Sequence, residues 1–364
     1  MTTHTSRTRS AILVSKKADT RLRERIRDGD TARVDYLELA DYIDAEIIDF
    51  NTVEASKSQF VQWATKHHGF YWGMTALVLQ RRKEFDHIYA SAEDIGLHLA
   101  MVATVVRNLR FSLVVHNGGT PKRSTLFRLL GSHMYHRLFC LCEAQYKVLT
   151  EKIGLPRDKV RLINYCCDHT FFRPLKASIG DYILSIGIEQ RDYHTLQQAA
   201  AMVPYSFRVV ASGWSSNTEF TAARGVEGGG NIVVERNISS HSLKELYASA
   251  RFIVVPLKHT AYAAGITTIT EAMAMGKAVI VSGAPGVLDY VKDGVSGLVV
   301  PVGDAHALQR AITYLWERPE LVERMGAHNR RWIEESFTIE QYVDNIVKGM
   351  NINAGTMALS SMRS

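Results

Sequence analysis

The stretch "AAGITTITEAMAMGKAVIVSGAPG", residues 263–286, gathers hydroxyl groups at the start of an expected helix. Thr267, Thr268 and Thr270 are β-branched and lose side-chain freedom in a helix, so helix propensity alone does not explain their presence. The free backbone N–H groups and the dipole at a helix start attract anions, and threonine hydroxyls add donors. Gly265 permits close approach of the backbone to a ligand. The stretch therefore predicts an anion-binding helix start.

Glu271 lies one helical turn further along, where its carboxylate can accept hydrogen bonds from vicinal hydroxyls such as those of a ribose. A diphosphate at the helix start beside a ribose at Glu271 describes a nucleoside diphosphate. Helix capping is the alternative, because threonine and glutamate are also ordinary residues at a helix start. From these residues alone, capping is the simpler interpretation.

Short apolar runs alternate with helix-length segments along most of the chain. Buried parallel strands read as continuous apolar runs and need long crossovers, so this alternation predicts parallel sheets covered on both faces. The first series is "AILVS" at 11, "EIIDF" at 46, "HIYAS" at 87, "FSLVV" at 111, "LFCLC" at 138 and "VRLIN" at 160. The second is "YILSIG" at 182, "FRVVAS" at 207, "NIVVE" at 231, "FIVVPL" at 252, "AVIVS" at 278 and "GLVVP" at 297. Two doubly wound α/β units in tandem fit the chain length.

The boundary between the two units is expected where a proline and a glycine interrupt the periodic pattern, in "FFRPLKASIGD", residues 171–181. We therefore predict a first domain over residues 1–174 and a second over residues 175–335. A C-terminal helix at about 336–352 is expected to cross back to the first domain, and the tail 353–364 is expected to be loose.

The composition, with 46% hydrophobic and 22% charged residues, is that of a soluble globular protein. No apolar run is long enough to span a bilayer, and the start "MTTHTSRTRS" lacks the apolar core of a signal peptide, so a cytoplasmic location is expected. The cysteine spacing matches neither a zinc site nor a disulfide framework. We expect buried reduced thiols at Cys140, Cys142, Cys166 and Cys167.

The positive charge is concentrated in the first half of the chain. Residues 1–180 contain 27 Lys and Arg against 19 Asp and Glu, whereas residues 181–364 contain 16 against 18. Residues 57–83 combine basic side chains with aromatic ones, among them Trp63, Phe70, Tyr71 and Trp72. Two interpretations stay open: an anionic membrane surface binds this half peripherally, or the charges are solvated and the aromatics face the core.

Four segments together resemble the GT4 family of retaining glycosyltransferases (glycosyl transferases group 1), which have the GT-B fold. Residues 242–315, which contain "GITTITEAMAMGKAVIVSGAPG", resemble the donor-binding domain of that family. "ILSIGIEQRDYHTLQQAA" at 183–200 resembles its first strand, glycine turn and helix. "GLPRDKVRLINYCCDHTFFRP" at 154–174 resembles the interdomain segment, and "LVVHNGGTPKRSTLFR" at 113–128 resembles the loop that carries the active-site histidine. Taken together, these segments outweigh the capping interpretation.

The resemblance implies an α/β protein with two Rossmann-like, doubly wound parallel-sheet domains facing across a cleft. It implies transfer of a sugar, of the hexosyl type, from a nucleotide-diphosphate sugar to an acceptor hydroxyl with retained anomeric configuration and without a metal. The nucleotide sugar is a donor substrate, so no separate cofactor is expected. The expected products are polysaccharides, glycolipids or other glycoconjugates, and the acceptor is lipid-linked or free.

The resemblance also assigns roles to particular residues. His116, Arg191 and Glu271 are the implied catalytic residues. Contacts with the nucleotide sugar are implied for Gly187, Asn237, Ile238, Ala264, Gly265, Ile266, Thr267, Thr268 and Glu271.

Three positions depart from the family pattern. The family usually carries two glutamates eight positions apart; Glu271 matches the second, but the first falls on Ala263. The arginine that follows the glycine turn in the family is Ile188 here, and Arg191 stands in for the lysine a little further on. The identity of the donor sugar therefore stays open.

Other functions remain as alternatives. A GT-B sugar-nucleotide epimerase shares the fold, and loss of one glutamate and one arginine fits a catalytically silent protein that binds nucleotide sugars. A dehydrogenase is disfavoured because no G-x-G-x-x-G follows the first strand. Nucleic acid is not an expected partner, because only basic charge supports it.

Overall fold

The structure is a computed structural model that describes residues 9–106, 109, 111–117, 121–130, 135–211 and 230–352. The chain forms two compact units. The first comprises Met1–Glu24, Val34–Ile163 and Tyr342–Ser364, and the second comprises Arg25–Arg33 and Asn164–Gln341. The predicted loose tail, residues 353–364, lies outside the described residues, and the predicted domain boundaries at 174 and 335 stay predictions.

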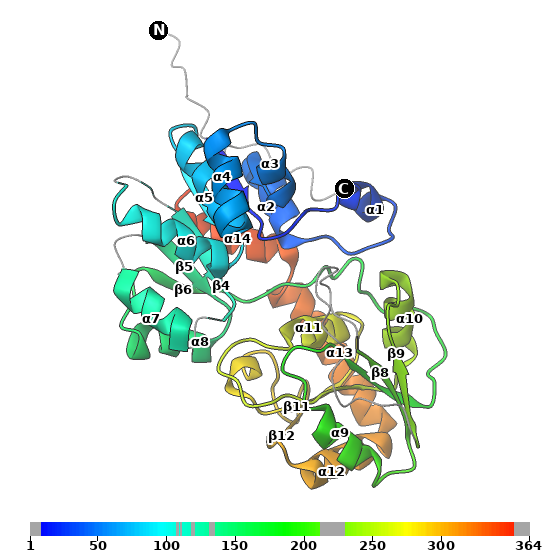
Figure 1. Cartoon of the computed structure of the whole chain (residues 1–364). Helices are drawn as coiled ribbons and strands as arrows, with labels where there is room; N and C mark the ends of the chain where they lie inside the picture. The colour runs from blue at the N-terminus through cyan, green and yellow to red at the C-terminus, as the bar shows by residue number, and fades with distance from the viewer. Residues whose placement is uncertain are drawn as a thin grey trace. The chain divides into compact units, whose positions relative to one another are not determined.

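The first unit is built on six parallel strands in the order β2-β1-β3-β4-β5-β6. Strands β4, β5 and β6 of this sheet are labelled in Figure 1. They are β1 (Ser10–Leu13), β2 (Ala45–Ile48), β3 (His87–Ala90), β4 (Phe111–Val115), β5 (Tyr135–Cys140) and β6 (Val160–Leu162). Every residue of β1 and β4 is buried, which is why these strands read as uninterrupted apolar runs.

Helices flank this sheet. They are α2 (Asp35–Ile43), α3 (Phe50–Glu54), α4 (Gln59–His68), α5 (Phe70–Arg81), α6 (Glu93–Ala103), α7 (Pro121–Leu130), α8 (Glu143–Lys147) and the π-helix η2 (Val148–Lys152). A short α1 (Leu22–Arg27) and the C-terminal α14 (Ile339–Met350) each have residues in both units. The core of the first unit is formed by strand residues such as Leu13 and Leu113 with helix residues such as Met74 and Leu99.

The second unit is built on six parallel strands in the order β12-β11-β10-β7-β8-β9. They are β7 (Tyr182–Ile186), β8 (Ser206–Val210), β9 (Ile232–Glu235), β10 (Ile253–Val255), β11 (Val279–Ser282) and β12 (Gly297–Val300). The helices are α9 (Tyr193–Ala200), α10 (Ser240–Ser249), α11 (Ile266–Ala274), the 3-10 turn η3 (Pro285–Val287), α12 (Ala305–Trp316) and α13 (Pro319–Ser336).

The strand order of the second unit reverses between β7 and β10, which are neighbours in the sheet. Doubly wound sheets bind ligands at such a switch point, beyond the carboxyl ends of the strands. The loop after β7 and the start of α11 after β10 both lie at that edge. All twelve predicted strands are present, and the prediction of two doubly wound parallel-sheet units is confirmed.

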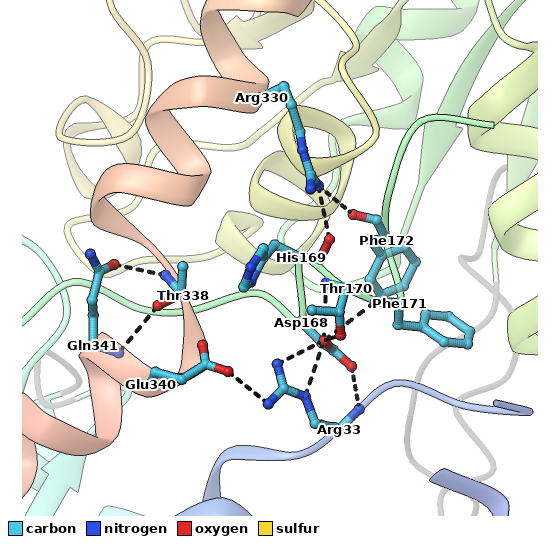
Figure 2. A network of polar contacts seen from close by, with 10 residues as sticks. All are labelled: Arg33, Asp168, His169, Thr170, Phe171, Phe172, Arg330, Thr338, Glu340 and Gln341. Carbon is cyan, nitrogen blue, oxygen red and sulfur yellow. Dashed lines mark hydrogen bonds and ion pairs between the residues drawn. The ribbon is translucent and has the colours of Figure 1, made fainter. Parts of the chain in front are cut away.

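A buried ion-pair network ties three segments of the second unit together (Figure 2). The Asp168 side chain accepts hydrogen bonds from the backbone N–H of Arg33 at 2.8 Å and from its Nε at 3.2 Å. Nη1 of Arg33 donates to Oε1 of Glu340 at 2.7 Å. Burial opposes ionisation of Asp168, but a hydrogen bond from Thr170 and the charge of Arg33 lower its pKa below the ordinary value. The network therefore holds Asp168 ionised.

Candidate active site

A buried arginine occupies the switch point of the second unit. Arg191 follows the turn after β7, and only 7% of its surface is exposed. Its Nε donates to the carbonyl of Ile186 at 2.8 Å and its Nη1 to the carbonyl of Glu189 at 3.0 Å. Nη2 donates to Oγ1 of Thr268, in the first turn of α11, at 2.9 Å. Three acceptors on two loops thus fix the guanidinium at the start of α11.

Among the residues that the structure describes, no carboxylate forms an ion pair with Arg191, and the exposed carboxylate of Glu189 acts on it only through its charge, as the weakest of the effects on its pKa. Burial lowers the pKa of Arg191 from its ordinary value, but a guanidinium stays protonated in proteins. A buried charge is costly unless an opposite charge neutralises it, and a guanidinium pairs well with phosphate oxygens. The arrangement therefore favours a bound anion beside Arg191.

Two glycines bracket the guanidinium. Gly187 has φ +100°, and a Cβ there would lie 2.6 Å from Nη2 of Arg191. Gly265 precedes the first residue of α11 with φ +88°, and a Cβ there would lie 3.1 Å from Nη1. Both positions exclude other side chains, so backbone and guanidinium approach one another closely at the helix start.

The threonines of α11 have different partners. Thr268 is buried and bonded to Arg191, whereas Oγ1 of Thr270 donates to the carbonyl of Ile266 at 2.9 Å within the helix. Thr267 is exposed, and Gly265, at the N-cap, has no side chain that could cap the helix. Helix capping therefore does not explain these threonines, because Thr268 instead binds and positions Arg191. Gly265 also offers no side-chain cap to the first backbone N–H groups of the helix.

Glu271 is buried further along α11, with 8% of its surface exposed. The hydroxyl of Tyr247, on α10, donates to Oε2 of Glu271 at 2.9 Å, and among the described residues Oε1 accepts no hydrogen bond. Burial raises the pKa of Glu271 to about 7. Tyr247 was not among the predicted site residues, because it reads as an ordinary apolar position of "SLKELYASA".

The remaining predicted residues of the second unit lie along the same sheet edge. Ala264 and Ile266 are buried on either side of Gly265. Asn237 and Ile238 follow β9; Asn237 is exposed with φ +54°, and Ile238 is half-buried. In the described part of the chain neither contacts Arg191.

His116 belongs to the first unit, directly after β4. Its Nε2 lies 3.2 Å from the carbonyl oxygen of Ser91. The backbone N–H groups of His116 and Asn117 donate to the buried carboxylate of Glu93 at 3.0 and 3.1 Å. Arg123 donates from Nη1 to Oε1 of the same carboxylate at 2.7 Å. Glu93 was not predicted, since nothing in the sequence around it marks it as an anchor of a loop 23 residues later.

Comparison with known families identifies the second unit. Residues 182–332, the segment that carries Arg191 and Glu271, match the family described as "Glycosyl transferases group 1". The chain contains a glycosyl transferases group 1 domain. The resemblance to glycosyl transferases group 1 is confirmed for this domain, whereas membership of the GT4 family and the retaining mechanism stay predictions.

Two characterised relatives of this glycosyltransferase domain come from bacteria. The chain is 28% identical over 177 residues to O-antigen chain mannosyltransferase C of Escherichia coli, a match that covers 47% of each protein. It is 24% identical over 286 residues to D-rhamnosyltransferase WbpZ of Pseudomonas aeruginosa, which covers 72% of this chain and 74% of WbpZ.

Solved glycosyltransferase structures share the fold of the whole chain. Sucrose-phosphate synthase of Thermosynechococcus elongatus superposes with a TM-score of 0.72 at 15% identity, over 94% of this chain and 98% of the other. Anabaena Alr3699/HepE in complex with UDP-glucose superposes with a TM-score of 0.71 at 16% identity, over 94% and 99%. The GT-B fold implied by the sequence is therefore confirmed.

Three further observations concern the cysteines, possible metal-binding sets and possible membrane-spanning helices. The four cysteines are buried, as expected, and form no disulfide within the described residues. No three side chains of His, Cys, Asp and Glu gather as a metal-binding set within the described residues. Over the same ranges, no helix combines the length and the apolar character needed to cross a membrane.

Proposed function

We propose that the protein is a retaining glycosyltransferase that moves a hexosyl-type sugar from a nucleotide-diphosphate sugar to an acceptor hydroxyl. The buried guanidinium of Arg191, without a carboxylate partner at the start of α11, carries this proposal. A diphosphate supplies the charge that this site lacks. The named activities of the two bacterial relatives, mannosyl and rhamnosyl transfer, support a role in the synthesis of polysaccharides or other glycoconjugates.

The proposed chemistry relies on electrostatic stabilisation. The bond between the anomeric carbon and the diphosphate oxygen breaks, and the acceptor oxygen forms its bond to the same face of the sugar. A phosphate oxygen of the leaving group takes the acceptor proton. Negative charge grows on the diphosphate, and Arg191 with the N-terminus of α11 stabilises it without reorganising. In this proposal no metal is required.

Each predicted side chain takes a part in the proposal. Glu271, held by Tyr247, accepts hydrogen bonds from the ribose, while Gly187 and Gly265 let backbone N–H groups approach the diphosphate. Asn237 and Ile238 contact the base through the backbone. His116 contacts the donor sugar or the diphosphate, with its loop held by Glu93.

For the acceptor, we propose a lipid-linked or membrane-adjacent molecule, with the protein bound peripherally to the anionic cytoplasmic face of a membrane. The basic first half of the chain supports this, as does α4, where Phe60 and Trp63 are 50% and 53% exposed and their rings stack at 6.5 Å. The aromatics of α5 differ, because Phe70, Tyr71 and Trp72 pack against the core.

A panel of nucleotides and nucleotide sugars tests the proposal. A ligand at about a hundred times its Kd stabilises the folded state by about 2.7 kcal/mol, which a thermal melt detects. The stabilising donor is then incubated with candidate acceptors, and transfer is followed by release of nucleoside diphosphate. If no nucleotide or nucleotide sugar of the panel stabilises the protein, the proposal of a donor site is wrong.

A second candidate is a silent protein that binds nucleotide sugars, and the alanine at position 263 favours it. Such a protein binds the donor but neither transfers nor hydrolyses it. An epimerase would instead change the configuration of the donor sugar, which product analysis of the same reaction shows.

A further inference from the structure

A carboxylate accepts a hydrogen bond from the residue that precedes the position where this chain lacks a glutamate. Tyr262 directly precedes Ala263, the position at which the sequence departs from the two-glutamate pattern. The hydroxyl of Tyr262 donates to Oε1 of Glu189 at 2.9 Å. Glu189 lies in the turn after β7 and Tyr262 in the loop after β10, so the pair spans the switch point of the second unit.

Both partners are held by their backbones. The carbonyl of Glu189 accepts from Nη1 of Arg191 at 3.0 Å, which places Glu189 beside the proposed diphosphate site. The backbone of Tyr262 packs closely on Gly286, because a Cβ added to Gly286 would lie 1.8 Å from the carbonyl oxygen of Tyr262. The position of this carboxylate is therefore set by the fold around it.

The Glu189 carboxylate has a free acceptor. The side chain is exposed, and its second oxygen, Oε2, accepts no hydrogen bond among the residues that the structure describes. A carboxylate repels phosphate oxygens, but it accepts hydrogen bonds from hydroxyl groups. Beside a diphosphate site, hydroxyls are offered by the ribose and by the transferred sugar. Since the ribose is assigned to Glu271 in the proposed function, the transferred sugar is the group left for Glu189.

We propose that Glu189, oriented by Tyr262, binds hydroxyls of the donor sugar and takes the place of the carboxylate that Ala263 lacks. This inference rests on the proposed function, since it assumes that a nucleotide-diphosphate sugar lies beside Arg191. It makes Glu189 a residue that determines donor specificity. The sugar it selects has free hydroxyls on the side that faces the loop after β7.

Calorimetry on the full chain tests this with paired probes, UDP with UDP-glucose and GDP with GDP-mannose, using whichever pair binds the parent. In Glu189→Ala the free nucleotide binds within twofold of the parent, whereas the nucleotide sugar binds about tenfold to a hundredfold more weakly. Tyr262→Phe weakens binding of the nucleotide sugar by a smaller factor. In the Glu189→Ala background it causes no further loss of affinity. Ala263→Glu in that background restores part of the lost affinity.

The outcomes separate the inference from the function beneath it. The proposed role of Glu189 is wrong if Glu189→Ala binds the nucleotide sugar as tightly as the parent does. It is also wrong if the variant loses affinity for the free nucleotide by the same factor as for the nucleotide sugar. In both cases the proposal of the donor site stands. If the parent binds no free nucleotide, the donor site itself is wrong and the inference falls with it. A melt of each variant confirms that the exposed substitution leaves the fold intact.

Discussion

Nη2 of Arg191 lies 2.9 Å from Oγ1 of Thr268, and this hydrogen bond joins the segment after β7 to the first turn of α11, between residues 77 positions apart in the chain. The bond aims a positive charge at the first turn of α11, where the helix dipole is already positive. The guanidinium and the positive end of the helix dipole repel each other at this point, and an anion between them would neutralise both. This relationship is the structural basis of the proposed donor site.

Replacement of Arg191 tests that basis. Arg191→Lys keeps the charge but loses the guanidinium fork, so nucleoside diphosphate binding should weaken by about 1.5 to 3 kcal/mol in calorimetry. The matched control is Arg208→Lys, since Arg208 belongs to the same unit and pairs with Glu235 on the neighbouring strand. Unchanged binding in a folded Arg191→Lys variant would show that the diphosphate lies elsewhere.

The raised pKa of Glu271, about 7, predicts how stability depends on pH. Between its ordinary value of 4.5 and about 7, the folded state keeps a proton that the unfolded state releases. The free energy of unfolding should therefore fall as pH rises through this range and level off above it. Denaturant titrations of Glu271→Gln should lack this component.

The exposed Glu245→Gln, on α10, is the control for Glu271 and should keep the slope of the parent. A Glu271→Gln variant with the same pH slope as the parent would contradict the assignment. The same variant should bind nucleoside diphosphate more weakly at pH 8, because an amide oxygen is a poorer acceptor for ribose hydroxyls than a carboxylate.

Turnover should survive removal of divalent cations. Arg191 and the N-terminus of α11 are proposed to neutralise the leaving diphosphate, which is the work that a metal does in other transferases. Initial rates are compared in a chelator and in added magnesium or manganese. Activity that vanishes in chelator and returns with manganese would overturn this mechanism.

The Arg33–Asp168 pair should contribute much more to stability than an exposed pair. The Asp168 side chain is 3% exposed, so Arg33→Ala leaves a buried carboxylate without its cation, and about 3 to 5 kcal/mol of stability should be lost. Arg23→Ala breaks an exposed pair with Asp41 and should cost about 0.2 to 1 kcal/mol. Equal midpoints of denaturation for the two variants would contradict this reading.

Membrane association is tested by liposome flotation with neutral and anionic lipid at low and high salt. Basic side chains near an anionic surface each contribute about 1 kcal/mol that salt screens, whereas burial of Trp63 adds a contribution that salt does not remove. Phe60→Ser with Trp63→Ser should abolish the salt-resistant fraction, and Tyr314→Ser, at an exposed position of α12, should not. Absence of the parent from both lipids at low salt ends the membrane proposal.

Local sequence signals were enough to predict the strands and their division into two parallel sheets. A run such as "FSLVV" predicts a parallel strand because β4 is buried on both faces. The glycine and threonines before Glu271 predict a helix start that suits an anion, and the donor site that we propose there stays a prediction. These are local signals, since burial and backbone conformation restrict which residue types each position accepts.

Which side chains meet depends on how the elements pack in three dimensions. Thr268 receives the guanidinium of Arg191, Tyr247 reaches Glu271 from another helix, and Tyr262 contacts Glu189 across two loops. The local sequence around one residue of such a pair does not indicate its partner. A hydrogen bond requires a distance of about 3 Å, and the packing of the sheet sets that distance. Tyrosine and threonine are ordinary at these positions, and their partners became visible once the chain was folded.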